Sequence, residues 1–274
     1  MKIFRRILGL FLGGLVLVSC AGGSNTGLAK EGKLIVGMEC DYQPFNFLET
    51  SNTSSNVAIA NVSGSYADGY DVQIAKIIAK ELNLELEVKA IAWDGLIPAL
   101  NSSEIDLIIA GMSVTEERLT SIDFTDAYYK SEEVLIVKSD SQYKEATSLD
   151  DLSGATVIGQ LGTIYADLVS QTVAHGAKAG TNLDTVPAII NAIVNNVVDA
   201  TIVELPVAAS IISEYEGLSL VRFAEGKGFT VSDSDVSVNI GIRKNFTYKD
   251  KINEILSTIS EDQRKELMDQ ASFK

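Results

Sequence analysis

Strand-like and helix-like segments alternate along this chain, and the alternation constrains the fold more than any other feature of the sequence. Residues 34–38 form an apolar run with strand character, residues 72–82 carry apolar side chains at helical spacing, and residues 84–90 alternate like a strand. The same order recurs from residue 134 onward. A βαβ order of this kind predicts an α/β fold with mainly parallel sheets and right-handed crossovers.

The segment 105–129 contains the most informative junction between a strand and a helix. An apolar strand-like run ends in a turn at Gly111, Ser113 follows, and Thr115 is the predicted N-cap of a helix that contains Arg118. Ligands of parallel sheets bind at such junctions, beyond the carboxyl ends of the strands. A hydroxyl, backbone N–H groups and a guanidinium together favour a carboxylate ligand. The alternative interpretation is a surface arginine at a helix start.

The first twenty residues have the pattern of an export signal. Three basic residues precede the apolar stretch 7–18, which is too short to span a bilayer comfortably. Residues 17–20, Leu-Val-Ser-Cys, resemble a lipobox, so we predict that residues 1–19 are a lipoprotein signal peptide and that Cys20 is the lipidation site. Residues 20–32 would then form a flexible tether. An ordinary secretory signal with an incidental cysteine is the alternative.

The acidic composition excludes several classes of function. The formal net charge is −15, and it becomes −18 when three basic and no acidic residues leave with the signal peptide, so we expect no nucleic-acid partner.

The single histidine, His175, lies in a polar segment without a nucleophile motif, which argues against a histidine-based metal site or a Ser-His-Asp triad. We expect no cofactor, because no phosphate loop or dinucleotide fingerprint occurs. Cys40 is predicted to be a buried packing residue.

Five further segments, read in order with the 105–129 junction, carry a resemblance to a known family. They are VGMECDYQPFNF (36–47), GYDVQIAKIIAKEL (69–82), WDGLIPALNSSEIDLIIAG (93–111), IGQLGT (158–163) and NIGIRKN (239–245). In this order and spacing they resemble the family 3 solute-binding proteins, the polar amino-acid receptors of ABC importers. The resemblance extends from about Lys33 to the C-terminus.

The resemblance implies an α/β, two-lobed, periplasmic-binding-protein-like (type II) fold. Each lobe would be a mainly parallel sheet flanked by helices. The first lobe would comprise residues 33–130 and 234–274, and the second would comprise residues 131–233. Two hinge crossings are expected near 129–132 and 231–236.

The resemblance also implies how an α-carboxylate would be held. Arg118 and Ser113 would bind it from the first lobe. The backbone N–H groups of Thr163 and Ile164, at a helix N-terminus, would bind it from the second lobe. Many relatives carry a second Thr or Ser at position 164, so this chain loses a hydroxyl there and keeps the amide.

The remaining groups of the ligand would meet two acids and two aromatic rings. The carbonyl of Gly111 and the carboxylate of Glu204 would bind the ammonium, although relatives usually carry Asp at position 204 and a helix-capping acid is the alternative. Tyr42 and Trp93 match rings that enclose the side chain in basic-amino-acid receptors, where cation–π attraction acts. Glu39 would pair with a distal cation. Core aromatics and a solvated rim acid are the alternatives.

These implications predict a lipid-anchored, extracytoplasmic, monomeric receptor that binds arginine or lysine and delivers it to an ABC permease. The first alternative is a receptor for glutamine or cystine in the same role, and the second is a sensor or adhesion lipoprotein. An enzyme related to the cyclic-acid dehydratases is disfavoured, because aromatic rings, an arginine and an acid form a binding set rather than an acid–base pair.

The polar stretch 49–66 is longer than the family usually carries. A small hairpin around residues 57–62 is predicted within it. The stretch is interpreted either as a surface loop or as a contact for the permease or the edge of a lid.

Overall fold

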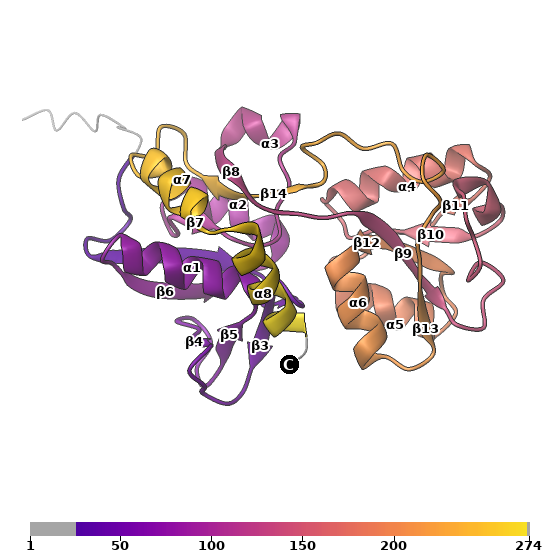
Figure 1. The fold of residues 1–274 in the computed structure, drawn as a ribbon, viewed down its shortest axis with the longest axis horizontal. Helices are drawn as coiled ribbons and strands as arrows, with labels where there is room; N and C mark the ends of the chain where they lie inside the picture. Colours follow the sequence, from indigo (N-terminus) through magenta and orange to yellow (C-terminus); the bar gives the residue numbers. More distant parts are fainter. Residues whose placement is uncertain (1–25, 273–274) are drawn as a thin grey trace, which may run out of the picture.

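Two five-stranded sheets with helices on their faces form two lobes, which lie side by side in the computed structural model (Figure 1). The structure describes residues 26–272, so the predicted signal peptide 1–19 and the predicted lipidation site Cys20 lie outside the described residues. None of the helices within this range is long and apolar enough to cross a membrane.

The sheet of the first lobe has the strand order β6-β1-β7-β14-β8. Its strands are β1 (Lys33–Met38), β6 (Glu85–Ala90), β7 (Leu107–Ile108), β8 (Asp123–Lys130) and β14 (Ser237–Ile242). Its helices are α1 (Tyr70–Glu81), α2 (Trp93–Asn101), α3 (Glu116–Ser121), α7 (Lys249–Thr258) and α8 (Glu261–Ser272). Strands β6, β1 and β7 are parallel, and β14 is antiparallel to both of its neighbours.

The sheet of the second lobe has the order β11-β10-β12-β9-β13. Its strands are β9 (Glu133–Lys138), β10 (Thr156–Ile158), β11 (Lys178–Ala179), β12 (Ala200–Glu204) and β13 (Leu218–Val221). Its helices are the 3₁₀ turn η1 (Leu149–Leu152), α4 (Ile164–Ala174), α5 (Val186–Val194) and α6 (Leu205–Glu214). Here β9 is the antiparallel strand. In both lobes the reversed strand is the first one after the chain arrives from the other lobe, because it enters the sheet from the hinge end.

The chain crosses between the lobes twice, and the two crossings lie side by side. The first crossing joins β8 to β9 through residues 131–132, and the second returns from β13 to β14 through residues 222–236. The N–H of Ser131 donates to the carbonyl of Val236 at 2.9 Å. This bond continues the β8–β14 ladder, in which Lys130 is paired with Ser237. The two crossings are therefore linked by a backbone hydrogen bond next to the β8–β14 ladder.

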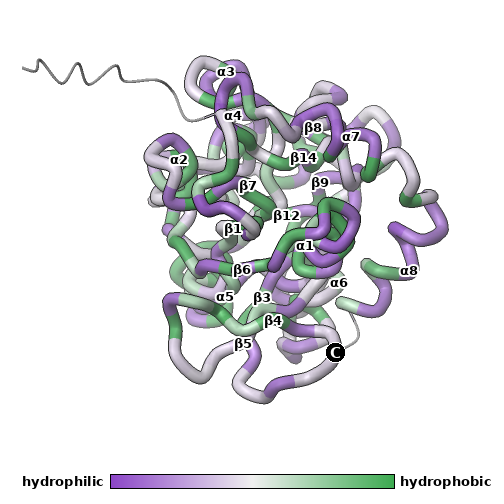
Figure 2. Tube along the Cα trace, turned by 90° about the vertical axis from the view of Figure 1, so that its left-hand side faces the viewer, coloured by the Kyte–Doolittle hydropathy of each residue, from purple (hydrophilic) through white to green (hydrophobic). Residues whose placement is uncertain are grey.

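Apolar strands form the centre of each lobe. Strand β1 is buried from Leu34 onward, and hydrophilic stretches are seen on the outer helices α7 and α8 in Figure 2. A buried ion pair lies within the first lobe, where Nη2 of Arg243 is 3.0 Å from Oδ1 of Asp106. Oδ2 of Asp106 also accepts the N–H of Ile35 at 3.0 Å. The carboxylate thereby ties the end of β14 to β1 and to the start of β7.

The segment 26–32 is folded onto the first lobe. Ala29 donates its N–H to Asp106 at 2.7 Å, and the carbonyl of Gly27 accepts from Arg243 at 2.7 Å. Leu28 packs against the core. The flexible tether predicted over residues 20–32 therefore does not extend into residues 26–32.

A second, four-stranded sheet with the order β2-β3-β5-β4 covers one end of the first lobe. Its strands are β2 (Asp41–Tyr42), β3 (Asn46–Glu49), β4 (Val57–Ala58) and β5 (Tyr66–Asp68). The hairpin predicted around 57–62 exists as β4 and β5, but its second strand begins only at Tyr66. Lys76 of α1 donates to the carbonyls of Ser54 and Ser55, which fixes this loop to the lobe.

Candidate ligand-binding site

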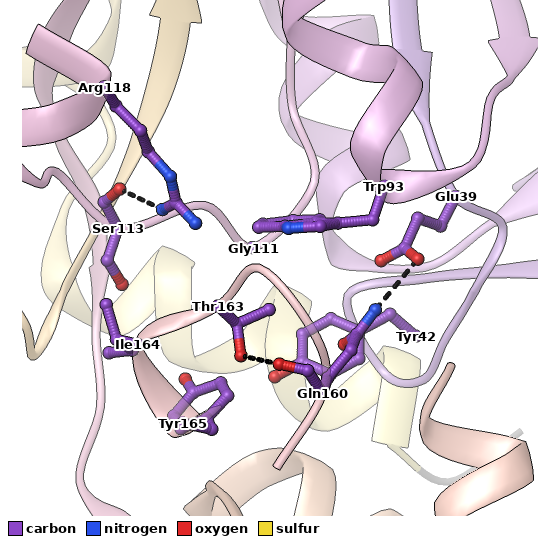
Figure 3. A pocket seen from close by; sticks show the side chains of 10 residues that line it. All are labelled: Glu39, Tyr42, Trp93, Gly111, Ser113, Arg118, Gln160, Thr163, Ile164 and Tyr165. Carbon is purple, nitrogen blue, oxygen red and sulfur yellow. Dashed lines mark hydrogen bonds between the residues drawn. The ribbon is translucent and has the colours of Figure 1, made fainter. Parts of the chain in front are cut away.

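A narrow cavity lies between the two lobes, at the carboxyl ends of their central strands. Its lining residues are Glu39, Tyr42, Trp93, Gly111, Ser113, Arg118, Gln160, Thr163, Ile164 and Tyr165 (Figure 3). Glu204, also singled out from the sequence, lies directly behind this lining at the end of β12. Gln160 and Tyr165 were not singled out.

Arg118 is the cationic group of the cavity. Helix α3 begins after its N-cap Thr115, whose hydroxyl accepts the N–H of Arg118 at 3.2 Å, and this cap fixes where the side chain leaves the helix. Nη1 donates to the carbonyl of Ser113 at 2.6 Å, and Nη2 donates to the carbonyl of Gly162 at 3.0 Å. Each of these nitrogens carries a second N–H. The residue is only 9% exposed, and desolvation lowers the pKa of the guanidinium.

The hydroxyl and amide groups expected near the carboxylate have definite partners in this structure. The Ser113 hydroxyl donates to the carbonyl of Asp235 at 3.1 Å, so its carbonyl rather than its hydroxyl contacts Arg118. Thr163 is the N-cap of α4, and both its N–H and its hydroxyl donate to the carbonyl of Gln160, at 3.3 and 2.7 Å. Ile164 is the first residue of α4, where backbone N–H groups have no acceptor within the helix.

The two predicted aromatic residues lie on different sides of the cavity. The ring of Tyr42 stacks on Phe45, with centroids 5.6 Å apart. A Cβ atom at Gly111, whose φ is 63°, would lie 2.9 Å from Cε1 of Tyr42, so glycine is required there both for its backbone conformation and for this close approach. The guanidinium of Arg118 lies over the indole of Trp93, with Cζ of Arg118 5.1 Å from the centroid of the ring. The cation that Trp93 contacts in this structure is therefore Arg118.

The two acids are desolvated and have only neutral hydrogen-bond partners among the described residues. Burial, reinforced by the nearby charge of Asp41, raises the pKa of Glu39 to about 8, although a 3.0 Å hydrogen bond from Nε2 of Gln160 opposes the shift. Burial raises the pKa of Glu204 to about 7, although hydrogen bonds from the hydroxyls of Tyr165 and Tyr42 oppose the shift. The hydroxyl of Tyr42 donates to Oε2 of Glu204 at 2.8 Å.

Several of these contacts join one lobe to the other. Tyr42 of the first lobe donates to Glu204 of the second, and Gln160 of the second donates to Glu39 of the first. The carbonyl of Gly162, in the second lobe, accepts from Arg118 and also from the indole N–H of Trp93 at 2.9 Å. The structure thus shows the lobes closed onto each other.

One protein-family model matches nearly all of the described part of the chain. Residues 34–272 match the model of the bacterial extracellular solute-binding proteins, family 3. The chain belongs to this family. Members of this family are solute-binding proteins. Solved structures that resemble this chain are two-lobed α/β proteins, which confirms the predicted fold class.

Relatives of this family 3 solute-binding protein include proteins with named ligands. The arginine-binding extracellular protein ArtP of Bacillus subtilis (strain 168) is 30% identical over 249 residues, which cover 89% of this chain and 88% of ArtP. An amino acid ABC transporter substrate-binding protein from Streptococcus pneumoniae, bound to L-arginine, has a TM-score of 0.73 at 26% identity, covering 88% of this chain and 94% of that one. An ancestral arginine-binding protein bound to glutamine has a TM-score of 0.69 at 28% identity, covering 88% and 98%.

The described residues of this family 3 protein offer no group of three or more His, Cys, Asp or Glu side chains suited to a metal ion. His175 contacts Asp150 at the surface, with Nδ1 2.6 Å from Oδ1. Cys40 is buried, as predicted.

Proposed function

We propose that this protein is the extracytoplasmic receptor of an ABC importer and that it binds an amino acid with a basic side chain, arginine or lysine, between its lobes. One observation carries the proposal. A single cavity contains a desolvated guanidinium, Arg118, together with Glu39, and the buried carboxylate of Glu204 lies behind its lining. Neither acid has a cationic partner among the described residues.

The charges of a basic amino acid complement this set. Buried charges are stable only when they are paired and hydrogen-bonded, and a basic amino acid brings one carboxylate and two cations. The carboxylate would meet Arg118 and the N–H of Ile164. The ammonium would meet Glu204 and the carbonyl of Gly111. The distal cation would meet Glu39, beside the rings of Tyr42 and Trp93.

Ligand entry requires the lobes to separate. We propose that residues 33–130 with 234–274 and residues 131–233 rotate as two bodies about the paired crossings, as in hinge closure around a ligand. Opening would break the contacts of Gly162 with Trp93 and Arg118. Arg118 would then be free to bind a carboxylate, and closure would follow.

The setting of the receptor is proposed from the sequence. Residues 1–19 would be removed as a signal peptide, and Cys20 would carry the lipid that anchors the protein at the extracytoplasmic face of the membrane. The partner would be the permease of the importer, and the receptor would act as a monomer. It would bind and release its ligand without chemical change, unlike an enzyme.

Glutamine is the second candidate ligand. The amide nitrogen of Gln160 already donates to Glu39, so this carboxyl group is placed to accept a hydrogen bond from a neutral amide. A glutamine side chain would present the same donor in place of Gln160.

The test is a binding experiment on residues 21–274, unfolded and refolded to remove any co-purified ligand. Thermal shifts would be measured with arginine, lysine, ornithine, glutamine and cystine, because a ligand at 100 times its dissociation constant stabilises by about 2.7 kcal/mol. We expect the largest shift with arginine or lysine and none with Arg118→Ala. Lys251→Ala, an exposed site on α7, is the matched control. A largest shift with glutamine would assign the second candidate, and no shift with any amino acid would refute the receptor function.

A further inference from the structure

We infer that Asp71 is a positioning residue that sets both ligand-facing loops of the first lobe, one through Tyr128 and the other through Asn46. The inference deepens the proposed function and rests on it. Asp71 is the second residue of α1, is completely buried, and is not part of the cavity lining. Its influence on a ligand would therefore be transmitted by the residues that it contacts.

The first chain of hydrogen bonds runs from Asp71 through Tyr128 to the turn at Gly111. The hydroxyl of Tyr128 donates to Oδ1 of Asp71 at 2.6 Å. Because this proton is committed to the carboxylate, the phenol oxygen presents a lone pair, and it accepts the N–H of Gly111 at 3.2 Å. Gly111 has a φ of 63° and approaches Tyr42 closely. The contact fixes the backbone of a turn whose carbonyl is the proposed acceptor for the ligand ammonium.

The second chain of hydrogen bonds runs from Asp71 through Asn46 to Cys40, in the loop between Glu39 and Tyr42. Nδ2 of Asn46 donates to Oδ2 of Asp71 at 2.8 Å, and Oδ1 of Asn46 accepts the N–H of Cys40 at 2.8 Å. A carboxylate only accepts, so it determines which way the carboxamide of Asn46 points. Cys40 has a φ of 63°, in the left-handed region that residues other than glycine rarely adopt. Such a conformation persists only where its surroundings hold it.

Both oxygens of Asp71 are thus occupied by donors that lead to cavity-lining residues. Burial raises the pKa of Asp71 to about 6, while hydrogen bonds from Tyr128, from Asn46 and from the backbone N–H of Gly111 favour the ionised form. The two loops come from segments far apart in the chain, after β1 and after β7. A single carboxylate that orients both keeps the carbonyl of Gly111, the ring of Tyr42 and the carboxyl group of Glu39 in one mutual arrangement.

The inference is tested with Tyr128→Phe and Asp71→Asn, compared with Tyr70→Phe as the matched control. Tyr70 is an equally buried tyrosine of the same cluster, stacked on Tyr128. Its hydroxyl donates to the backbone carbonyl of Tyr128 and not to Asp71, Gly111 or Asn46. Arginine affinity would be measured by calorimetry. The amide resonance of Gly111 would be followed by NMR after selective ¹⁵N-glycine labelling, because a general loss of stability does not move one folded-state resonance.

We expect Tyr128→Phe to weaken arginine binding about tenfold and to shift the Gly111 amide resonance, because one buried hydrogen bond is lost. Asp71→Asn should act on both loops and weaken binding more, whereas Tyr70→Phe should leave affinity and the Gly111 resonance unchanged. Wild-type affinity in both Tyr128→Phe and Asp71→Asn would overturn the inference. If the unaltered protein binds no amino acid, the proposed function fails, and an unchanged Gly111 resonance in Tyr128→Phe would then overturn the inference separately.

Discussion

The carboxamide of Gln160, in the second lobe, donates a 3.0 Å hydrogen bond to the carboxyl group of Glu39 in the first lobe. The same nitrogen donates to the carbonyl of Asp184 at 3.0 Å, so both of its hydrogens are used. A cationic side chain that reaches Glu39 would share its carboxyl group with Gln160, which bonds only Oε1. The contact links the charge of a bound ligand to the closure of the lobes.

Replacing Glu39 with Gln should change ligand preference more than overall affinity. The substitution removes the charge that would pair with a guanidinium or ammonium, while an amide still accepts from a neutral amide. We expect arginine to lose about 10- to 100-fold in affinity, the range for a hydrogen bond to a charged group, and glutamine to lose much less. Calorimetry with both ligands measures the ratio. Asp250→Asn, an exposed acid on α7 away from the cavity, is the control, and an equal loss for both ligands would contradict the proposed role.

The stability of the ligand-free protein should fall as the pH rises from about 5 to about 8. Burial raises the pKa of Glu39 to about 8 and that of Glu204 to about 7, above the value of about 4.3 in unfolded chains. Between these values the unfolded chain binds fewer protons than the folded one, so the contribution of each group, complete below about pH 4, is lost as the pH increases. Thermal unfolding across this interval measures the slope. Glu39→Gln should make it shallower, and a Tm that increases over the interval would refute the raised pKa values.

Lysine should not replace arginine at position 118. The guanidinium bridges the carbonyls of Ser113 and Gly162 and still has N–H groups for a carboxylate, whereas an ammonium is a single point donor. We expect Arg118→Lys to fold normally and to lose at least about 100-fold in ligand affinity, because the paired charge-assisted bonds are lost. Calorimetry beside Lys251→Ala, together with circular dichroism, separates binding from folding. Wild-type affinity would exclude a bidentate contact.

Trp93→Phe should shift the balance between the open and closed arrangements. The variant keeps an aromatic face but removes the indole N–H that reaches the carbonyl of Gly162 across the cleft. A net contribution of about 1 kcal/mol for this hydrogen bond predicts an affinity decrease of about fivefold, mainly through faster dissociation. Stopped-flow fluorescence displacement measures the rate. Unchanged dissociation would show that the contact does not hold the closed form.

Arg243→Met should destabilise the protein without altering the binding site. The buried carboxylate of Asp106 would lose its ionic partner, and breaking a buried pair costs about 3–5 kcal/mol. Urea unfolding measures this loss, and the double variant with Asp106→Leu should recover part of it. Ligand affinity at low temperature should stay unchanged, because neither residue lines the cavity.

Local patterns predicted the elements whose signals lie within one segment. Strand β1, helix α1 and the Thr115 cap follow directly from apolar spacing and capping residues. Strand β8 was not predicted as a strand, because Asp123 and Asp126 interrupt its apolar pattern and its partner β14 lies far along the chain. Helix α5 ends at Val194, two residues before Asn196, whose φ of 56° cannot continue an α-helix.

The resemblance pointed to cavity-lining residues in both lobes, but the contacts that join the lobes across the cleft were not predicted. Gln160 reaches Glu39 only when the second lobe closes on the first, whereas Tyr165 donates to Glu204 within the second lobe, between elements far apart in the chain. No local spacing encodes either contact. The stacking of Arg118 on Trp93 has the same origin, because Gly162 of the second lobe accepts hydrogen bonds from both. Asp71 and Tyr128 were missed because a buried acid and a tyrosine in apolar segments resemble ordinary core positions.

The bond between Ser131 and Val236 ties the two crossings of the hinge together. Two crossings that are tied together next to the β8–β14 ladder constrain the relative movement of the lobes more than two independent linkers would. Ligand binding in the cavity would then change the distance between the outer surfaces of the two lobes. A membrane partner that contacts both lobes would respond to this distance without contacting the ligand itself.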